Sequence, residues 1–358
     1  SWLFPDMSSL EPFSSFSTDR QREPLSPSLD AELRRVAAID IGTNSTHLLV
    51  ASVDPVLHTF SIDLAEKSTT RLGERDPDSG VLTELAMGRV FETLQRFKDL
   101  VESYKVEQLV IAATSAVREA PNGRIFINQV KDQLGLEVDL ISGAEEARLI
   151  YLGVLSGMPF GESPHILLDI GGGSTELILA DSRDARALTS TRVGAVRLQR
   201  DFVKQDPLSS SRLDFLKTFI QGSLEPAVDK ICRRLKPGEM PTMVATSGTA
   251  MAIGALAASE EINPPLKLHG YRLSRERLDK LIERLVKLTP EQRRKLPSIS
   301  DRRAEIILPG ALILQATMHM LEMDELVLSE RALREGLIFD WMLRKGLLKD
   351  RFSFQSSI

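Results

Sequence analysis

Two segments of this sequence repeat one another at almost the same spacing. DIGTNSTHLL (residues 40–49) matches DIGGGSTELI (169–178) at Asp, Ile, Gly, Ser, Thr and the first Leu, 129 residues further on. ATSA (113–116) recurs as ATSG (245–248), 132 residues further on. Two matches at nearly one offset indicate duplication of a domain-sized unit rather than a short solenoid repeat. We therefore expect two related domains with a cleft between them.

Length and charge are consistent with that expectation and set limits on the ligand. A chain of 358 residues with 42% hydrophobic content can form two medium-sized cores. The 45 basic and 50 acidic residues give a net charge of -5, which provides no overall attraction for nucleic acid or an anionic membrane. We expect neither as a partner, so an anionic ligand has to be bound by a local cluster.

The cysteine content and the chain's first segment suggest a cytoplasmic protein. Cys232 is the only cysteine and cannot form an internal disulfide, and no His/Cys cluster has zinc-like spacing. The most apolar run, Met243 to Ala258, is diluted by Thr, Ser, Gly and Ala, so we expect it to be buried rather than to span a membrane. Residues 1–35 are rich in Ser, Pro and Asp, carry no secretory signal pattern, and are predicted to be disordered.

The remaining pattern alternates strands and helices, as in an α/β protein. Both repeated segments read as strand, glycine-rich turn and strand, which predicts two hairpins. Apolar spacing and β-branched runs between and after the hairpins predict helices at 84–101, 124–134, 213–235, 274–288, 305–321 and 333–343, and strands at 109–116 and 136–142. Pro264, Pro265, Pro297 and Pro309 punctuate the helical part. We place domain I at 36–148, completed by a helix at about 330–346, and domain II at 149–329.

The two repeated turns are candidate phosphate sites. Glycines allow backbone N–H groups to approach an anion, and adjacent hydroxyl and amide groups add donors. The candidate phosphate ligands in the turns are Gly42, Asn44, Ser45, Gly171, Gly172, Gly173, Ser174 and Thr175. The carboxylates of Asp40, Asp169 and Glu176 are candidate ligands for Mg²⁺ or Mn²⁺. Alternatively, each turn is a simple hairpin with glycine at positive φ; a nucleotide P-loop is absent.

The segment ISGAEEARLI (141–150) supplies a candidate base. Ser142 and Glu145 have the spacing of a capping box, in which Glu145 bonds back to the start of a helix. Glu146 lies about 100° further round that helix and is free to face the cleft, where it can polarise a water. The alternative is a carboxylate that merely interacts favourably with the helix dipole.

Four arginines near predicted turns are candidate cations. Arg71, Arg118, Arg192 and Arg197 can pair with phosphate oxygens and stabilise the charge of phosphoryl transfer. The alternative for each is a solvated surface side chain, and Arg118 is preferred because it follows the repeated Ala-Thr-Ser element. His47 in the first hairpin reads as a packed or solvated side chain rather than a ligand.

Taken together, these motifs closely resemble the exopolyphosphatase and guanosine pentaphosphate phosphatase (Ppx/GppA) family, within the actin, sugar kinase and Hsp70 superfold. The resemblance covers about Val36 to Gly346. It rests on AIDIGTNS (38–45), ATSAVR (113–118), ISGAEEARLI (141–150), LDIGGGSTEL (168–177), ATSGT (245–249) and LSERALREG (328–336).

The resemblance implies a duplicated ribonuclease-H-like α/β fold whose interdomain cleft holds a phosphate chain and Mg²⁺. It implies that Glu146 is the general base, that Asp169 and Glu176 are metal-associated acids, and that Arg118 contacts phosphate. A Glu146-activated water would then attack the terminal phosphorus in line. The family also implies a homodimer. This chain resembles the short, two-domain form without the appended helical domains, which leaves processivity and long-chain binding open.

Inorganic polyphosphate is the substrate we expect, and several alternatives stay open. Hydrolysis of guanosine pentaphosphate (pppGpp) would use the same residues. Transfer to a nucleoside diphosphate would need a nucleotide pocket that the sequence does not reveal. A sensor that binds phosphate chains without turnover is a fourth reading, since fold alone does not prove catalysis.

Overall fold

Both predicted hairpins are present, and each forms the centre of a sheet. The computed structural model describes residues 33–348. In it, β1 (Arg34–Ile41) pairs antiparallel with β2 (Thr46–Asp54), and β6 (His165–Ile170) with β7 (Thr175–Ala180). Residues 1–35 were predicted to be disordered, and positions 1–32 of them lie outside the described residues. The prediction is wrong for Arg34 and Arg35, because both belong to β1.

The two sheets repeat one strand order. The first runs β3-β2-β1-β4-β5, and the second, read from β8, runs β8-β7-β6-β9-β11-β10. In both, the first three strands in chain order are antiparallel neighbours. The strands beyond the first strand in the sheet, β4 and β5 or β9 and β11, run parallel to it, and β10 adds an antiparallel edge to the second sheet. The duplicated ribonuclease-H-like fold is therefore confirmed. The remaining strands are β3 (Thr59–Ser68), β4 (Gln108–Ala113), β5 (Asp139–Leu140), β8 (Ala185–Thr191), β9 (Thr242–Thr246), β10 (Arg272–Ser274) and β11 (Glu325–Ser329).

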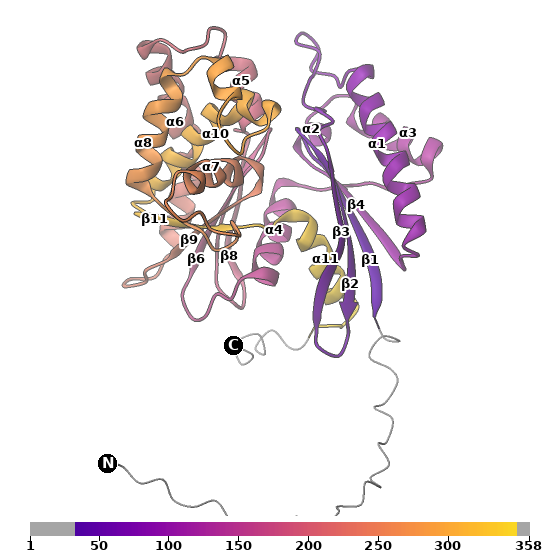
Figure 1. Ribbon diagram of the computed structural model, residues 1–358. Coiled ribbons are helices and arrows are strands. Elements are labelled where there is room, and N and C mark those ends of the chain that lie inside the picture. Colours follow the sequence, from indigo (N-terminus) through magenta and orange to yellow (C-terminus); the bar gives the residue numbers. More distant parts are fainter. Residues whose placement is uncertain (1–32, 349–358) are drawn as a thin grey trace, which may run out of the picture.

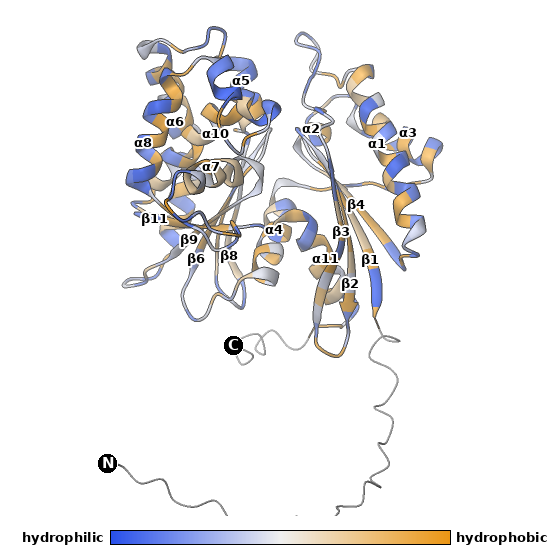
Figure 2. Cartoon of the chain, in the orientation of Figure 1, coloured by the Kyte–Doolittle hydropathy of each residue, from blue (hydrophilic) through white to orange (hydrophobic). Residues whose placement is uncertain are grey.

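Helices cover both sheets, with apolar residues concentrated toward the strands (Figures 1 and 2). All six predicted helices form, and none in residues 33–348 has the length and hydropathy needed to cross a membrane. The helices are α1 (Glu84–Ser103), α2 (Ser115–Arg118), α3 (Gly123–Leu134), α4 (Gly143–Gly157), α5 (Ala195–Phe202), α6 (Ser210–Arg234), α7 (Ser247–Ser259), α8 (Arg275–Lys287), α9 (Pro290–Arg294), α10 (Asp301–Met320) and α11 (Leu333–Arg344).

Some predicted elements need correction. β3 has no predicted counterpart, because most of its side chains are exposed and leave no apolar run. The predicted strand at 136–142 shrinks to the two residues of β5, and the strand predicted at 109–116 ends at Ala113, where a turn leads into α2. Pro309 lies inside α10, as it does in the helix predicted at 305–321, and buried residues surround it on both sides. Tertiary packing outweighs local propensity there.

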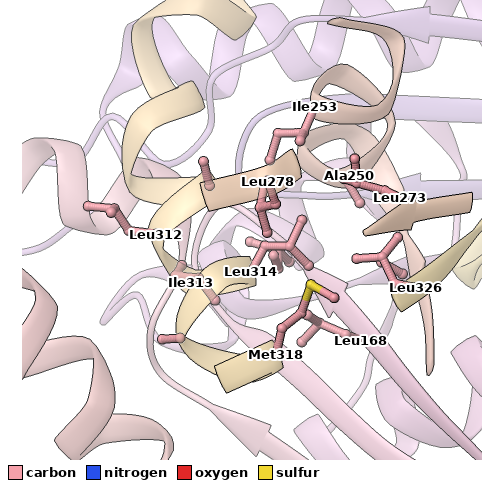
Figure 3. Packing of buried hydrophobic residues seen from close by; sticks show 14 of the residues in the cluster. Leu168, Ala250, Ile253, Leu273, Leu278, Leu312, Ile313, Leu314, Met318 and Leu326 are labelled. Carbon is pink, nitrogen blue, oxygen red and sulfur yellow. The ribbon is translucent and has the colours of Figure 1, made fainter. Parts of the chain in front are cut away.

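Three apolar clusters hold the fold together. One lies between the first sheet and helices α1 and α3, and a second fills domain II, where Leu168 packs near Leu278, Leu314 and Met318 (Figure 3). The third joins both sheets through α4 and α11. The two domains therefore share part of their core.

Close contact between α4 and α11 fixes the centre of the molecule. A Cβ at Gly153 would lie 1.8 Å from the Ala332 carbonyl oxygen, and a Cβ at Gly336 would lie 1.8 Å from that of Leu149. Only glycine permits this approach. The predicted domain boundary at 148/149 falls inside α4, so this helix belongs to the junction. The first turn of α4, which carries Glu146, is thereby held between the domains.

Candidate active site

The two repeated turns have the same backbone geometry. Gly42 N–H donates to Ser45 O at 3.0 Å, and Gly171 N–H donates to Ser174 O at 2.9 Å. Both turns line an interdomain cavity of about 400 Å³. Within residues 33–348, no hydrogen bond engages the N–H groups that follow the first glycine of each turn, at positions 43–45 and 172–174. Successive free N–H groups of this kind form an anion-binding concavity.

The second turn is supported by the start of α5. The N–H groups of Val196 and Arg197 both donate to Gly172 O at 3.0 Å. A Cβ at Gly194 would lie 2.4 Å from the same oxygen, so glycine is required for this contact. Because the carbonyl side of the turn is bonded to α5, its N–H side is left for the cavity.

The loop after β3 supports the first turn in a similar way. Arg71 N–H donates to Asn44 O at 3.1 Å, and Gly73 N–H donates to Thr43 O at 2.8 Å. The Arg71 guanidinium pairs with Glu74 at 3.2 Å, is 41% exposed and does not line the cavity. The Arg71 side chain thus lies outside the cavity lining, and its backbone N–H supports the first turn at Asn44.

Four predicted phosphate ligands besides Arg71 also lie outside the cavity lining. The Thr175 hydroxyl donates to Val193 O at 2.7 Å, and Arg192 is 80% exposed and pairs with Glu119 at 3.3 Å. The residues outside the lining are Arg71, Arg118, Gly173, Thr175 and Arg192, whereas Gly42, Asn44, Ser45, Gly171, Gly172 and Ser174 line it. Their roles toward a ligand stay predictions.

The predicted acids occupy matching positions in the two hairpins. Asp40 lies opposite His47 across β1 and β2, and Asp169 lies opposite Glu176 across β6 and β7. In the first hairpin the pair is an acid and a histidine, with Asp40 Oδ2 and His47 Nδ1 3.7 Å apart. In the second hairpin both members are buried acids. The second hairpin therefore holds the stronger concentration of negative charge.

Burial and mutual repulsion favour the neutral form of these acids. Burial raises the pKa of Asp169 to about 8, with repulsion from Glu146 and Asp40 adding to the effect and a hydrogen bond from Ser247 opposing it. Burial and repulsion from Asp169 raise the pKa of Glu176 to about 7. A bound cation would offset both effects.

Glu176 has an oxygen available for such a cation. Its Oε1 accepts hydrogen bonds from the Ser174 and Ser190 hydroxyls, both at 2.8 Å. Its Oε2 is buried and, within the described chain, has no hydrogen-bond partner. A buried unpaired carboxylate oxygen is costly unless a proton or cation accompanies it.

The residues present fit Mg²⁺ by donor chemistry. Residues 33–348 contain no cluster of three or more His, Cys, Asp or Glu side chains arranged to hold a metal. Mg²⁺ does not require one, since it commonly binds through one or two carboxylates, several waters and substrate phosphates. Asp169 and Glu176, with the unpaired Oε2, match that requirement.

Glu146 lies in the first turn of α4, as predicted. The Ser142 hydroxyl caps the helix by accepting from Glu145 N–H at 3.1 Å. The predicted return bond of the capping box is wrong, because the Glu145 carboxylate accepts from Arg148 at 2.9 and 2.8 Å. Glu146 is 7% exposed and lines the cavity.

The surroundings of Glu146 favour its protonated form. Burial, followed by repulsion from Glu176, raises the pKa of Glu146 well above its ordinary value, while Arg118 opposes the rise. Arg118 Nη1 lies 3.3 Å from Glu146 Oε1 and donates to Ile141 O at 2.8 Å. A general base works best with a pKa closer to neutrality than that of a free carboxylate. Arg118 is placed to orient the Glu146 carboxylate.

Three cations that were not predicted from the sequence line the cavity: Lys67, Arg303 and Arg334. Arg334 pairs with Glu335 at 3.2 Å, whereas Lys67 and Arg303 have no ion-pair partner among the described residues. Burial and repulsion from Arg302 lower the pKa of Arg303 to about 10. Partial desolvation and repulsion from Arg303 and Arg334 lower the pKa of Lys67. Lys67 and Arg303, which lack an ion-pair partner, are therefore available to an anionic ligand.

The sequence did contain a signal for one of these three cations, Arg303. Arg302 and Arg303 lie in the first turn of α10, after the N-cap Ser300. Positive side chains are disfavoured at a helix N-terminus, so two adjacent arginines there indicate another use. Lys67 had no such signal, because its strand was not predicted. Ser247 also lines the cavity, where it donates a hydrogen bond to Asp169. It could have been found from the sequence, because it occupies the position of Ser115 in the repeated ATS element.

The model of the Ppx/GppA phosphatase family matches residues 34–345. The chain belongs to this family.

Family members with known names or structures match over most of the chain. Exopolyphosphatase 1 of Mycobacterium leprae is 32% identical over 306 residues, which are 85% of this chain and 88% of that protein. Guanosine-5'-triphosphate,3'-diphosphate pyrophosphatase of Photobacterium profundum is 32% identical over 90% of this chain but only 61% of its own length. The crystal structure of the Aquifex aeolicus family member has a TM-score of 0.74 and 31% identity, covering 87% of this chain and 99% of that one.

Proposed function

We propose that this protein is an exopolyphosphatase, which hydrolyses the terminal phosphate of inorganic polyphosphate. The observation that carries the proposal is one cavity that combines a buried glutamate of raised pKa, two turns with free N–H groups, and the unpaired cations Lys67 and Arg303. Relatives that are named exopolyphosphatases, and that align with this chain over 88% and 98% of their own length, support the choice of substrate.

The proposed mechanism is a single displacement at phosphorus. Glu146 accepts a proton from a water molecule as the water oxygen bonds to the terminal phosphorus, and the bond from that phosphorus to the bridging oxygen breaks. The shortened chain leaves with the bridging oxygen, and orthophosphate is released. N–H groups of the two turns and the Arg303 guanidinium stabilise the charge that develops on the phosphate oxygens.

We further propose that Asp169 and Glu176 hold Mg²⁺, or alternatively Mn²⁺, with Asp40 nearby. When bound, the cation would neutralise phosphate charge and the like-charged acids around Glu146. Binding of Mg²⁺, measured by calorimetry on the wild type and on Asp169→Asn, tests the assignment independently of turnover.

Hydrolysis of pppGpp is the second candidate function. It is favoured by the relative from Photobacterium profundum, whose name specifies a guanosine pentaphosphate substrate and which matches 90% of this chain. Both substrates present a terminal phosphoanhydride to the same residues. Phosphate release from short polyphosphate, long polyphosphate and pppGpp, each with and without Mg²⁺, separates the two functions. Binding of all three without release would instead indicate a sensor.

We also propose a cytoplasmic homodimer on the strength of the family resemblance. The single cysteine, Cys232, is exposed and unpaired, as suits a reducing compartment. Light scattering of the purified protein gives its mass in solution, and a mass of one chain would reject the dimer.

Activity is expected to keep rising with pH beyond the range in which an ordinary glutamate titrates. Glu146 acts as a base only when ionised, and its pKa is raised by burial and by Glu176. The value of kcat/KM for polyphosphate should therefore still increase above about pH 5, where an unperturbed glutamate would already give a constant value. Glu176→Gln removes one repelling charge and should shift the rise to lower pH. A flat profile for the wild type would contradict the assignment of Glu146.

Arg303 is expected to contribute to substrate binding. Arg303→Gln removes a cation that has no protein partner, so the variant should lower kcat/KM for polyphosphate by about 10- to 100-fold, the usual range for a charged hydrogen bond. Arg284→Gln is the control, because Arg284 lies on α8 and pairs with Glu260 away from the cavity. Equal kinetics for the two variants would reject the role of Arg303.

A further inference from the structure

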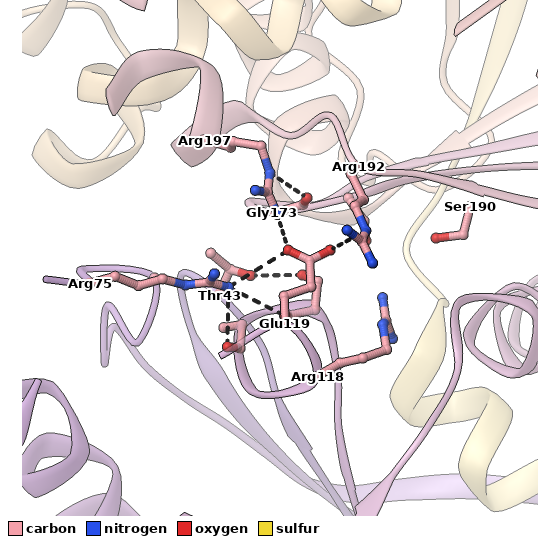
Figure 4. Close-up of polar contacts among 12 residues, drawn as sticks. Thr43, Arg75, Arg118, Glu119, Gly173, Ser190, Arg192 and Arg197 are labelled. Atoms are coloured by element: carbon pink, nitrogen blue, oxygen red, sulfur yellow. Dashed lines mark hydrogen bonds and ion pairs between the residues drawn. The ribbon is translucent and has the colours of Figure 1, made fainter. Parts of the chain in front are cut away.

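Glu119 lies at the centre of an ion cluster that joins the two domains. Its carboxylate lies 3.7 Å from Arg75 Nη2 and 3.3 Å from Arg192 Nε, and it also pairs with Arg197 (Figure 4). Glu119 follows α2, and Arg75 lies in the loop before α1, both in domain I, whereas Arg192 and Arg197 flank the start of α5 in domain II. The side chains of Glu119, Arg75 and Arg197 are 8%, 13% and 22% exposed, so solvent screens the pairs among them weakly, whereas Arg192 is exposed.

Two arginines of the cluster also donate hydrogen bonds to backbone carbonyl oxygens in or beside the phosphate turns. Arg75 Nη2 donates to Ser115 O at 3.4 Å and to Ala116 O at 3.2 Å. Arg197 Nε donates to Gly173 O, in the second turn, at 3.1 Å. One carboxylate therefore connects, through two guanidinium groups, a segment of each domain that borders the cavity.

The segments held in this way contact one another directly. The hydroxyls of Thr43, in the first turn, and Ser115 lie 3.0 Å apart. A Cβ at Gly173 would lie 2.5 Å from Ser115 Oγ and 2.8 Å from Thr43 Oγ1. The second turn thus meets the first turn and Ser115 at a position where no side chain fits. The spacing of the two turns is set at this contact.

We propose that Glu119 is a positioning residue that fixes the spacing of the two phosphate turns by holding the domains together. The role deepens the proposed function and rests on it, because the turns are taken to bind successive phosphates. Without the carboxylate, three guanidinium groups would face one another with no shared counter-charge, and their repulsion is relieved when the domains separate. The turns would then bind the phosphates of the transition state less well.

The test compares Glu119→Gln with Glu239→Gln. Glu239 is a matched control because it also loses one charge from a close arginine pair, to Arg186 at 2.7 and 3.0 Å, but within domain II. Spin labels at native Cys232 on α6 and at an introduced cysteine, Glu92→Cys on α1, report the distance between the domains. All variants are made in the full chain.

Glu119→Gln should lengthen or broaden the label distance distribution, and Glu239→Gln should leave it unchanged. In proteins without labels, Glu119→Gln should lower kcat/KM for polyphosphate by about 10- to 100-fold, because misplacement by about 1 Å has effects of this size. Arg197→Gln should have a similar effect, and combining it with Glu119→Gln should add little.

An unchanged distance distribution in Glu119→Gln would overturn the proposal, even if activity fell. Tighter binding of polyphosphate by Glu119→Gln would also overturn it, since the arginines would then be an anion site that Glu119 blocks. If the wild type hydrolysed no phosphoanhydride, the proposed function would fail, and the distance measurement would still decide whether Glu119 holds the domains together.

Discussion

Replacing Glu146 by glutamine is expected to lower phosphate release by about two to four orders of magnitude, the usual contribution of a general base. Glutamine has nearly the same shape but cannot accept a proton from water. The side chain is buried in the cavity wall and its main partner is Arg118, so the substitution should leave the fold and phosphate-chain binding intact. Single-turnover phosphate release and equilibrium binding of polyphosphate measure the two properties separately.

Glu145→Gln is the matched control for this prediction. It alters the preceding residue of the same helical turn, whose carboxylate pairs with Arg148 and does not line the cavity. Its turnover should stay close to that of the wild type. Near wild-type turnover by Glu146→Gln would reject Glu146 as the base, and loss of binding together with turnover would assign it to the ligand site instead.

Asp169→Asn is expected to have opposite effects on activity and on stability. Activity should fall by at least about 100-fold, since the proposed Mg²⁺ site loses a carboxylate and even residues that only support metal ligands contribute 10- to 100-fold. The unfolding free energy without divalent cations should increase at about pH 8. Burial raises the pKa of Asp169 from 3.8 to about 8, so the wild type loses stability as pH rises through this interval. Asparagine carries no charge and avoids that loss.

Thermal unfolding at about pH 4 and pH 8, without divalent cations, measures the stability effect. At the lower pH the wild-type carboxyl is neutral in the folded state and about half ionised in the unfolded state, so little of the loss has occurred and the difference between the variant and the wild type should be small. Mg²⁺ should raise the unfolding temperature of the wild type at the higher pH more than that of the variant. Lower stability of Asp169→Asn at both pH values would mean that the charged form of Asp169 supports the fold.

The repeats carried most of the predictable information about the fold. The repeated turns of DIGTNS and DIGGGS place glycine where backbone N–H groups are left free, and both hairpins formed where the repeats predicted them. Glu146 was predictable in position because the Ser142 cap sets where α4 begins. Local sequence determines features of this kind, since caps and tight turns depend on a few adjacent residues.

Features that depend on distant contacts were harder to predict. β3 is mostly exposed and is held by pairing with β2, so its sequence shows no apolar run, and Lys67 went unnoticed with it. Arg71 and Arg192 were predicted as phosphate ligands, and that role stays a prediction; their ion pairs with Glu74 and Glu119 could not be predicted from the sequence. Which guanidinium meets a carboxylate and which meets a ligand is decided by tertiary structure.

Hydrolysis of polyphosphate in ¹⁸O-labelled water tests most directly whether a Glu146-activated water attacks the terminal phosphorus. The mechanism predicts that wild-type protein with Mg²⁺ releases only orthophosphate carrying one ¹⁸O, that the shortened chains carry none, and that Glu146→Gln releases almost no phosphate. Label in the remaining chains, release of internal fragments, or labelled orthophosphate from Glu146→Gln at the wild-type rate would contradict it.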